Sequence, residues 1–108
     1  MESEILNDMN RKIVKNFLDI LVLMELRKSS MSGYDVTALV QKKLGMLMSP
    51  GTVYSFLYFL ERNGLIKGEW NQRKRVYRLT EKGEKTITIL FEKKDKILGL
   101  VLNLFLGG

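Results

Sequence analysis

The first part of the chain carries apolar residues at helical spacing. Between residues 10 and 28 they return every three or four positions, which predicts an amphipathic helix with Asn10 as its N-terminal cap. The acidic segment of residues 2–6 either forms a short helix of its own or extends this helix, because the polar residues between the two weaken helicity. The pattern alone leaves that choice open.

Two further helices are predicted from the residues that start them. Residues 32–35 read Ser-Gly-Tyr-Asp, which is a capping box, and they predict a helix over residues 33–44 that the following glycine ends. Ser49 and Pro50 form a second start signal, because serine accepts a free backbone N–H and proline loses nothing at the first helical position. The predicted third helix covers residues 50–63.

This third predicted helix has two different faces. Val53, Leu57 and Leu60 share one face, which is expected to pack in the core. Tyr58 and Phe59 lie on or towards the other face, which is polar and unusually aromatic.

After Gly64 the pattern changes from helical spacing to a strand-like composition. Residues 65–70 and 75–79 flank a polar, basic run over residues 71–74, which predicts a β-hairpin with a charged tip. Thr80 then caps a last helix from residue 81 onward. This helix carries a broad apolar stripe made of Ile87, Leu90, Phe91, Ile97, Leu98, Val101, Leu102 and Phe105.

The order of these elements predicts a fold that is mainly α with a small β-hairpin. It is the order of a winged helix-turn-helix, over residues 1–80, followed by a C-terminal dimerisation helix over residues 81–108 of the same compact unit. A lone copy would expose the apolar stripe as a large patch, and Leu90, Ile97 and Leu104 are spaced by sevens. The expected partner of this helix is therefore a second copy of the chain.

Residue composition excludes most enzyme chemistry. The chain has no Cys and no His, so thiol nucleophiles, imidazole bases and the common zinc sites are absent. Without a convergent pair of carboxylates, no catalytic site, metal or cofactor is expected, and the chain is expected not to be an enzyme.

The ends of the chain bear on its location. The acidic start, with Glu2 and Glu4, is unlike a secretory signal, and the longest apolar stretches are too short to span a membrane. A cytoplasmic protein without a membrane partner is expected. Lys93, Lys94 and Lys96 beside the apolar stripe would also suit a membrane-surface helix, although a dimerisation helix explains the stripe better.

The charge of the chain favours an anionic partner. With 18 Lys and Arg against 12 Asp and Glu the net charge is +6, and residues 67–85 contribute +4 of it through seven cations and three acids. In a winged helix-turn-helix the third helix enters the major groove of duplex DNA while the hairpin, or wing, follows the phosphate backbone. Positive charge on the hairpin therefore predicts double-stranded DNA as the partner.

Four motifs in order also resemble the PadR family of transcriptional regulators. They are Ser-Gly-Tyr-Asp at 32–35, Ser-Pro-Gly-Thr-Val-Tyr at 49–54, Leu-Glu-Arg-Asn-Gly-Leu-Ile at 60–66, and Arg-Val-Tyr-Arg-Leu-Thr-Glu-Lys-Gly at 75–83. The resemblance implies a dimeric winged-helix repressor, of the smaller kind with a single C-terminal dimerisation helix, which binds an inverted repeat.

The resemblance also implies which residues contact DNA. The candidates, carried over by position and from the basic wing, are Ser32, Tyr34, Ser49, Thr52, Ser55, Tyr58, Arg62, Gln72, Arg73, Lys74 and Arg75. The first two are expected near phosphates, the third helix in the groove, and the cations on the wing. Residues 55–59 read Ser-Phe-Leu-Tyr-Phe where the family usually has cations or proline, so thymine methyls, hydroxyl contacts and DNA shape are expected to replace guanine readout by arginine.

Other interpretations of the same residues stay open. The cluster at residues 73–75 could be a solvated turn, Tyr34 and Tyr54 could be core aromatics with a hydroxyl at the surface, and Trp70 could pack under the wing. Some relatives bind flat apolar ligands with aromatic residues at a dimer pore, which keeps a small apolar effector as an option. The alternative function is a winged-helix module that binds another protein through the aromatic face of the third helix.

Overall fold

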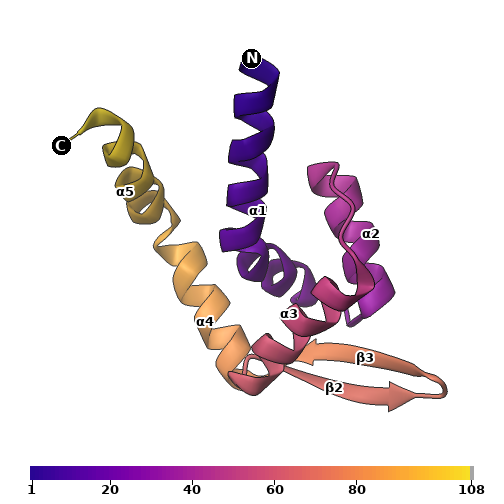
Figure 1. Ribbon diagram of the computed structural model, residues 1–108. Coiled ribbons are helices and arrows are strands. Elements are labelled where there is room, and N and C mark those ends of the chain that lie inside the picture. Colours follow the sequence, from indigo (N-terminus) through magenta and orange to yellow (C-terminus); the bar gives the residue numbers. More distant parts are fainter. Residues whose placement is uncertain (108) are drawn as a thin grey trace.

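The chain folds into helices that pack against a small antiparallel sheet, whose hairpin projects past them (Figure 1). The computed structural model describes residues 1–107. In chain order the elements are α1 (Glu2–Leu26), β1 (Met31–Ser32), α2 (Gly33–Leu44), α3 (Pro50–Arg62), β2 (Ile66–Asn71), β3 (Lys74–Leu79), α4 (Glu81–Glu92) and α5 (Lys94–Leu106). The prediction of a mainly α-helical fold with a small hairpin is confirmed.

α1 is one continuous helix of 25 residues, so the acidic lead-in extends it. The prediction that Asn10 caps the helix is wrong, because this residue lies inside the helix, whose N-cap is Met1. Ile5, Met9 and Ile13 continue the four-residue apolar spacing ahead of and beyond Asn10, and this explains the longer helix. Every residue up to Ile13 is exposed, and in Figure 1 this half of α1 stands away from the rest of the molecule.

α2 begins and ends where the sequence predicts. The Asp35 N–H donates to the Ser32 hydroxyl at 3.1 Å, and the Ser32 N–H donates to the Asp35 carboxylate at 2.9 Å, which completes the capping box. This backbone hydrogen bond from Ser32 holds the pKa of Asp35 below its ordinary value of 3.8. Gly45 ends the helix with a φ of 66°, in the left-handed region that favours glycine.

α3 also starts at its predicted cap. The Thr52 N–H donates to the Ser49 hydroxyl at 3.2 Å, and proline occupies the first turn. Val53, Leu57 and Leu60 are buried, so the predicted inner face of this helix is confirmed.

The hairpin is tighter than the sequence suggests. Asn71 pairs with Lys74, so the turn consists of Gln72 and Arg73 alone rather than of the four residues predicted. Gln72 has a φ of 59°, and this left-handed conformation lets the turn close within two residues.

A third strand joins the hairpin. β1 pairs with β3 through Met31 opposite Tyr77 and Ser32 opposite Val76, which gives the strand order β1-β3-β2. This strand is not predicted by the sequence, because two residues are too few to show an alternating pattern.

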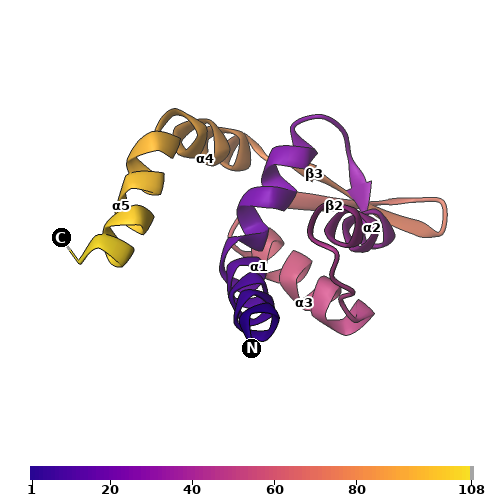
Figure 2. The same ribbon diagram turned by 90° about the horizontal axis from the view of Figure 1, so that it is seen from above.

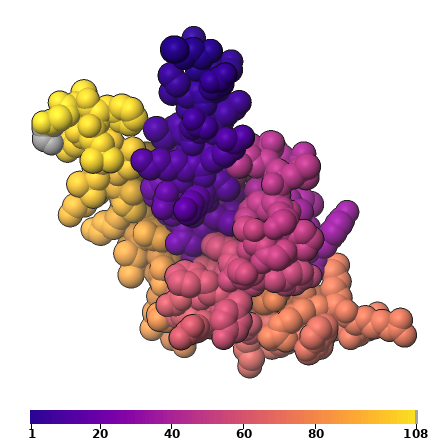
Figure 3. All heavy atoms as spheres, viewed as in Figure 1, coloured from indigo at the N-terminus to yellow at the C-terminus, as the bar shows by residue number. Residues whose placement is uncertain are grey.

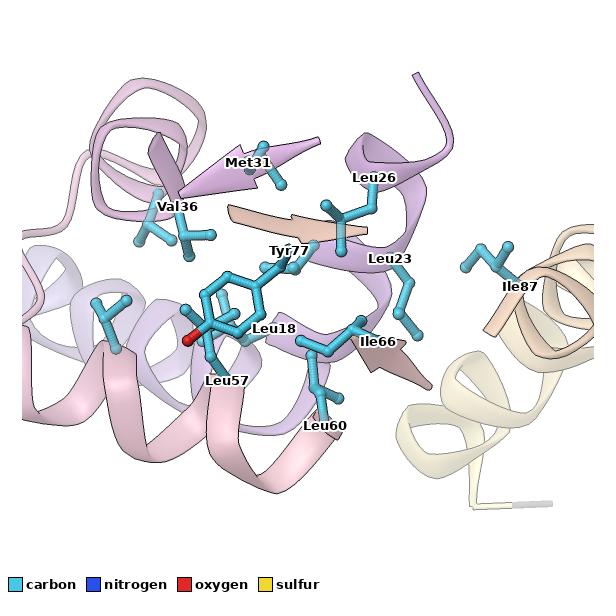
Figure 4. Close-up of a cluster of buried hydrophobic side chains, with 13 residues drawn as sticks. Leu18, Leu23, Leu26, Met31, Val36, Leu57, Leu60, Ile66, Tyr77 and Ile87 are labelled. Atoms are coloured by element: carbon cyan, nitrogen blue, oxygen red, sulfur yellow. The ribbon is translucent and has the colours of Figure 1, made fainter. Parts of the chain in front are cut away.

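The hydrophobic core lies where α1, α2, α3 and α4 meet the sheet. Figure 4 shows side chains from α1, α3 and the strands pointing toward one another. Val22, Val40, Leu57, Leu60 and Ile87 have no exposed surface. Burying a side chain of this kind contributes about 1.5–3 kcal/mol, so these positions fix the relative placement of the helices.

The C-terminal region differs from its prediction. It forms two helices, not one, because the chain leaves the helical conformation at Lys93, with φ −98° and ψ 13°, between α4 and α5. Ile87, predicted to lie at a dimer contact, is instead buried against the body of the same chain, since α4 packs on α1 and β3. Gly83 makes this packing possible, because a Cβ at this position would overlap the backbone carbonyl of Leu65.

The molecule is more extended than a compact chain of its length. Its radius of gyration is 15.3 Å, whereas about 13 Å is expected for a domain of this size. Figures 2 and 3 show the cause: α5 and the N-terminal half of α1 project from the body, and so does the tip of the wing.

Crossing a bilayer would take a longer apolar helix than any within residues 1–107.

Candidate nucleic-acid interface

The outward face of α3 is exposed along its length. Tyr58, which is 66% exposed, and Phe59 point away from the core, as the helical pattern predicts. The other predicted groove residues on this helix are also exposed, namely Thr52, Ser55 and Arg62, and so is the cap Ser49. This face offers hydroxyl groups and aromatic rings, with a single cation near its end.

The tip of the wing carries cations that are not neutralised. Gln72, Arg73 and Lys74 are all exposed, and among residues 1–107 neither of the two cations forms an ion pair. Further along the wing the Arg78 guanidinium donates to the Glu69 carboxylate at 3.1 Å. Two adjacent residues of the turn region, Arg73 and Lys74, therefore carry positive charge that no ion pair balances.

Arg75 behaves differently from Arg73 and Lys74. Its side chain is turned back onto the sheet and is held by the Glu61 carboxylate of α3 at 3.1 Å. The guanidinium also lies over the rings of Trp70 and Tyr77, with distances of 5.7 and 5.8 Å to the ring centres. The sequence grouped this arginine with the DNA contacts of the wing, but in the structure its half-buried guanidinium forms an ion pair with Glu61.

A hollow of about 430 Å³ separates the wing from the start of α2 and from α3. Its walls combine aromatic rings with cations, and they consist of Ser32, Gly33, Tyr34, Tyr54, Trp70, Arg73, Lys74, Arg75 and Tyr77. Tyr34 is 77% exposed and Trp70 is 69% exposed, so neither ring is a core aromatic. The set of DNA-binding candidates omitted four wall residues, Gly33, Tyr54, Trp70 and Tyr77. The only sequence signal of the exposed pair, Tyr54 and Trp70, was their aromatic character.

Ser32 lines the hollow but is not an exposed contact. It is buried, and its hydroxyl accepts the N–H of Asp35. Its place in the sequence motif is explained by helix capping and by its pairing with Val76 of β3.

The predicted dimerisation residues separate into three groups by burial. Ile87 belongs to the core, and Leu90 and Ile97 are half-buried. The remaining five, Phe91, Leu98, Val101, Leu102 and Phe105, are exposed. No side chain of α5, whose residues the structure describes in full, is buried.

Solved structures share this arrangement. The chain is similar to a PadR family transcription regulator from Clostridium difficile, with 27% identity, a TM-score of 0.68 and coverage of 83% of this chain and 98% of that one. It is similar to Bacillus subtilis PadR in complex with operator DNA, with 27% identity, a TM-score of 0.58 and coverage of 68% of this chain and 45% of that one. It is also similar to F93 from STIV, a winged-helix DNA-binding protein, with 25% identity, a TM-score of 0.61 and coverage of 78% and 91%. The predicted winged-helix fold is confirmed.

A family model settles which group of winged-helix proteins this is. No curated protein matches the chain. The model of the transcriptional regulator PadR-like family, however, matches residues 21–89, which run from α1 through the hairpin into α4. That span contains all four sequence motifs and both elements of the exposed surface. The chain therefore belongs to the PadR-like family of transcriptional regulators, which are DNA-binding regulators and not enzymes.

Proposed function

We propose that this regulator is a homodimeric repressor that binds an inverted repeat in double-stranded DNA. The observation that carries the proposal is that Tyr54, an exposed residue of α3, and the unpaired cations Arg73 and Lys74 of the wing tip line one hollow, so α3 and the wing can meet the same duplex. Because such a regulator acts on DNA, we place it in the cytoplasm.

The outward face of α3 is the proposed groove-reading surface. Thr52, Ser55 and Tyr58 supply hydroxyl groups and a ring at successive turns. Arg62 is the only cation on this helix, at its end, so bidentate contact with guanine contributes little. Hydroxyl contacts, thymine methyl groups and DNA shape are the proposed means of selection.

The proposed phosphate contacts come from the wing and from the hollow. Arg73 and Lys74 form no ion pair among the described residues, so their charge is available to phosphate groups. Tyr34 and Tyr54, on the walls of the same hollow, add hydroxyl groups at the start of α2 and α3. Ser32 is left out of the proposed contacts because it is buried.

The proposed dimer rests on the exposed apolar surface of α5. Leu98, Leu102 and Phe105 are well exposed in a single copy, and soluble monomers rarely leave a contiguous apolar surface of this kind uncovered. The N-terminal half of α1 adds Ile5, Leu6 and other exposed apolar residues. We propose that a second copy covers both surfaces, with residues 81–108 as the dimerisation segment except where α4 packs on the body. Two-fold symmetry then places two α3 helices on half-sites about 10 base pairs apart or a multiple of that spacing.

Selection from random duplex DNA at about 0.15 M salt tests the proposal, since exposed electrostatics are partly screened under these conditions. The expected result is an enriched inverted repeat, and its position relative to a promoter then tests repression in a reporter assay. Enrichment of a single asymmetric half-site would contradict the dimer geometry. Absence of any DNA binding would favour the second candidate, a protein-binding module, which the exposed rings of Tyr58 and Phe59 on α3 support.

A further inference from the structure

The outer half of the wing has little support from the sheet. β1 pairs with β3 only at Val76 and Tyr77, so beyond these positions the hairpin is a ribbon of two strands within the described chain. An isolated two-stranded hairpin is marginally stable in water. Arg73 and Lys74 lie at the end of this ribbon, and its orientation decides where they meet DNA.

Glu61 on α3 links that ribbon to the recognition helix. Its carboxylate accepts the backbone N–H of Gly68 in β2 at 2.9 Å and receives the Arg75 guanidinium of β3 at 3.1 Å. One side chain of α3 therefore contacts both strands of the wing.

Arg75 extends this link toward the tip. It is paired across the ribbon with Trp70, and its guanidinium lies over the rings of Trp70 and Tyr77. Gly68 leaves the space that the arginine occupies, because a Cβ there would lie 2.7 Å from Arg75 Nε and 2.9 Å from the Tyr77 ring. The close fit around the guanidinium shows that its orientation is built into the sheet.

We propose that Glu61 is a positioning residue, which fixes the wing relative to α3 through Gly68 and Arg75. This inference rests on the proposed DNA-binding function and assigns to this ion pair a role apart from direct DNA contact. Holding the wing in one orientation before DNA arrives lowers the ordering entropy lost on binding. The Glu61–Arg75 ion pair therefore contributes to the affinity for DNA, although its two charges contact each other and not the DNA.

The test compares Glu61→Gln with Glu69→Gln in the full-length protein. Each change removes one carboxylate that pairs with an arginine at 3.1 Å, and each raises the net charge by one. Electrostatics alone predicts slightly tighter DNA binding for both variants. A positioning role predicts that Glu61→Gln alone binds the selected duplex about tenfold more weakly.

Trp70 gives a readout that does not depend on DNA. It is the only tryptophan in the chain and lies in the wing beside Arg75, so its time-resolved fluorescence anisotropy reports the motion of the ribbon. Glu61→Gln is expected to add a fast component to the decay, with the melting temperature close to that of the wild type. Glu69→Gln is expected to leave the decay unchanged.

Each possible result of these measurements either supports or overturns the positioning role of Glu61. An unchanged Trp70 decay, or DNA binding by Glu61→Gln as tight as by Glu69→Gln, would overturn the positioning role while leaving the proposed DNA binding intact. Failure of the wild type to bind any duplex would instead overturn the proposed function itself, and the positioning role with it. If Glu61→Gln does not fold, Arg75→Lys replaces it, with Arg78→Lys as its control. Lysine keeps the charge but lacks the planar guanidinium, so the same loss of binding and the same faster decay are expected for Arg75→Lys alone.

Discussion

The winged-helix body and the α5 arm use their apolar residues in opposite ways. In the body, α3 buries Val53, Leu57 and Leu60 completely and exposes a mostly polar and aromatic face. α5 is more apolar along its length, yet none of its side chains is buried in the single chain. The body thus satisfies its hydrophobic residues within one copy, whereas the arm has a surface that only another molecule can cover.

The strongest test of this contrast places charges on the arm. Leu98→Asp together with Leu102→Asp is expected to convert the proposed dimer into a monomer or an aggregate, because carboxylates would have to be buried in an apolar contact. Light scattering coupled to size-exclusion chromatography measures the mass. As a control, Leu57→Ala in the body is expected to lower the free energy of unfolding by about 2–5 kcal/mol without changing the mass. A dimer that survives the double change would show that α5 does not form the contact.

A second test separates DNA binding from assembly. Arg73→Ala with Lys74→Ala is expected to weaken binding to all duplexes about equally and to reduce the slope of log K against log salt by about 0.9 for each phosphate group that is no longer neutralised. Fluorescence anisotropy titrations over a range of salt concentrations measure the slope. The control is Lys12→Ala with Lys15→Ala, which removes the same charge from the exposed side of α1, where no change of slope is expected. Equal slopes for the wild type and the wing variant would refute the assignment of the wing.

The smallest expected effect concerns stability in acid. The pKa of Asp35 is lowered in the folded protein by the hydrogen bond from the Ser32 backbone, so its carboxylate contributes stability above about pH 3.8 and loses it as the pH falls through the lowered folded value. Asp35→Asn keeps the shape but not the charge, and is expected to lower the free energy of unfolding by about 0.5–1 kcal/mol near neutral pH. Urea unfolding at a series of pH values should show the two proteins converging below pH 3.8. A difference that persists unchanged in acid would mean that the charge of Asp35 is not its source.

The local signals in the sequence predicted most of the body. The caps Ser32 and Ser49 and the stop at Gly45 were correct because each acts through hydrogen bonds or backbone conformations within a few residues. Asn10 failed as a cap because the apolar spacing continues ahead of it, and a long amphipathic face outweighs a single capping preference.

Two differences between the predicted site residues and their surroundings in the structure have another origin. Arg75 carries the same charge as Arg73, yet it is directed inward because Gly68 leaves space and Glu61 lies opposite it. Ile87 fits the apolar stripe of a dimer helix, yet it is buried in its own chain because Gly83 lets α4 approach Leu65. Both outcomes depend on groups that are distant in the sequence, namely Glu61 for Arg75 and Leu65 for Gly83.

By itself the sequence determined α2 and α3, the hairpin, the apolar face of α3 and the excess of positive charge near the wing, because these follow from spacing, capping residues and composition. Only the tertiary structure decided which of those charges reach the solvent, which apolar residues of the C-terminal region stay uncovered, and that β1 joins the sheet. The physical reason is that an ion pair or a buried contact requires two groups to meet in space, and the groups that meet here are separated along the chain, as Glu61 and Arg75 are.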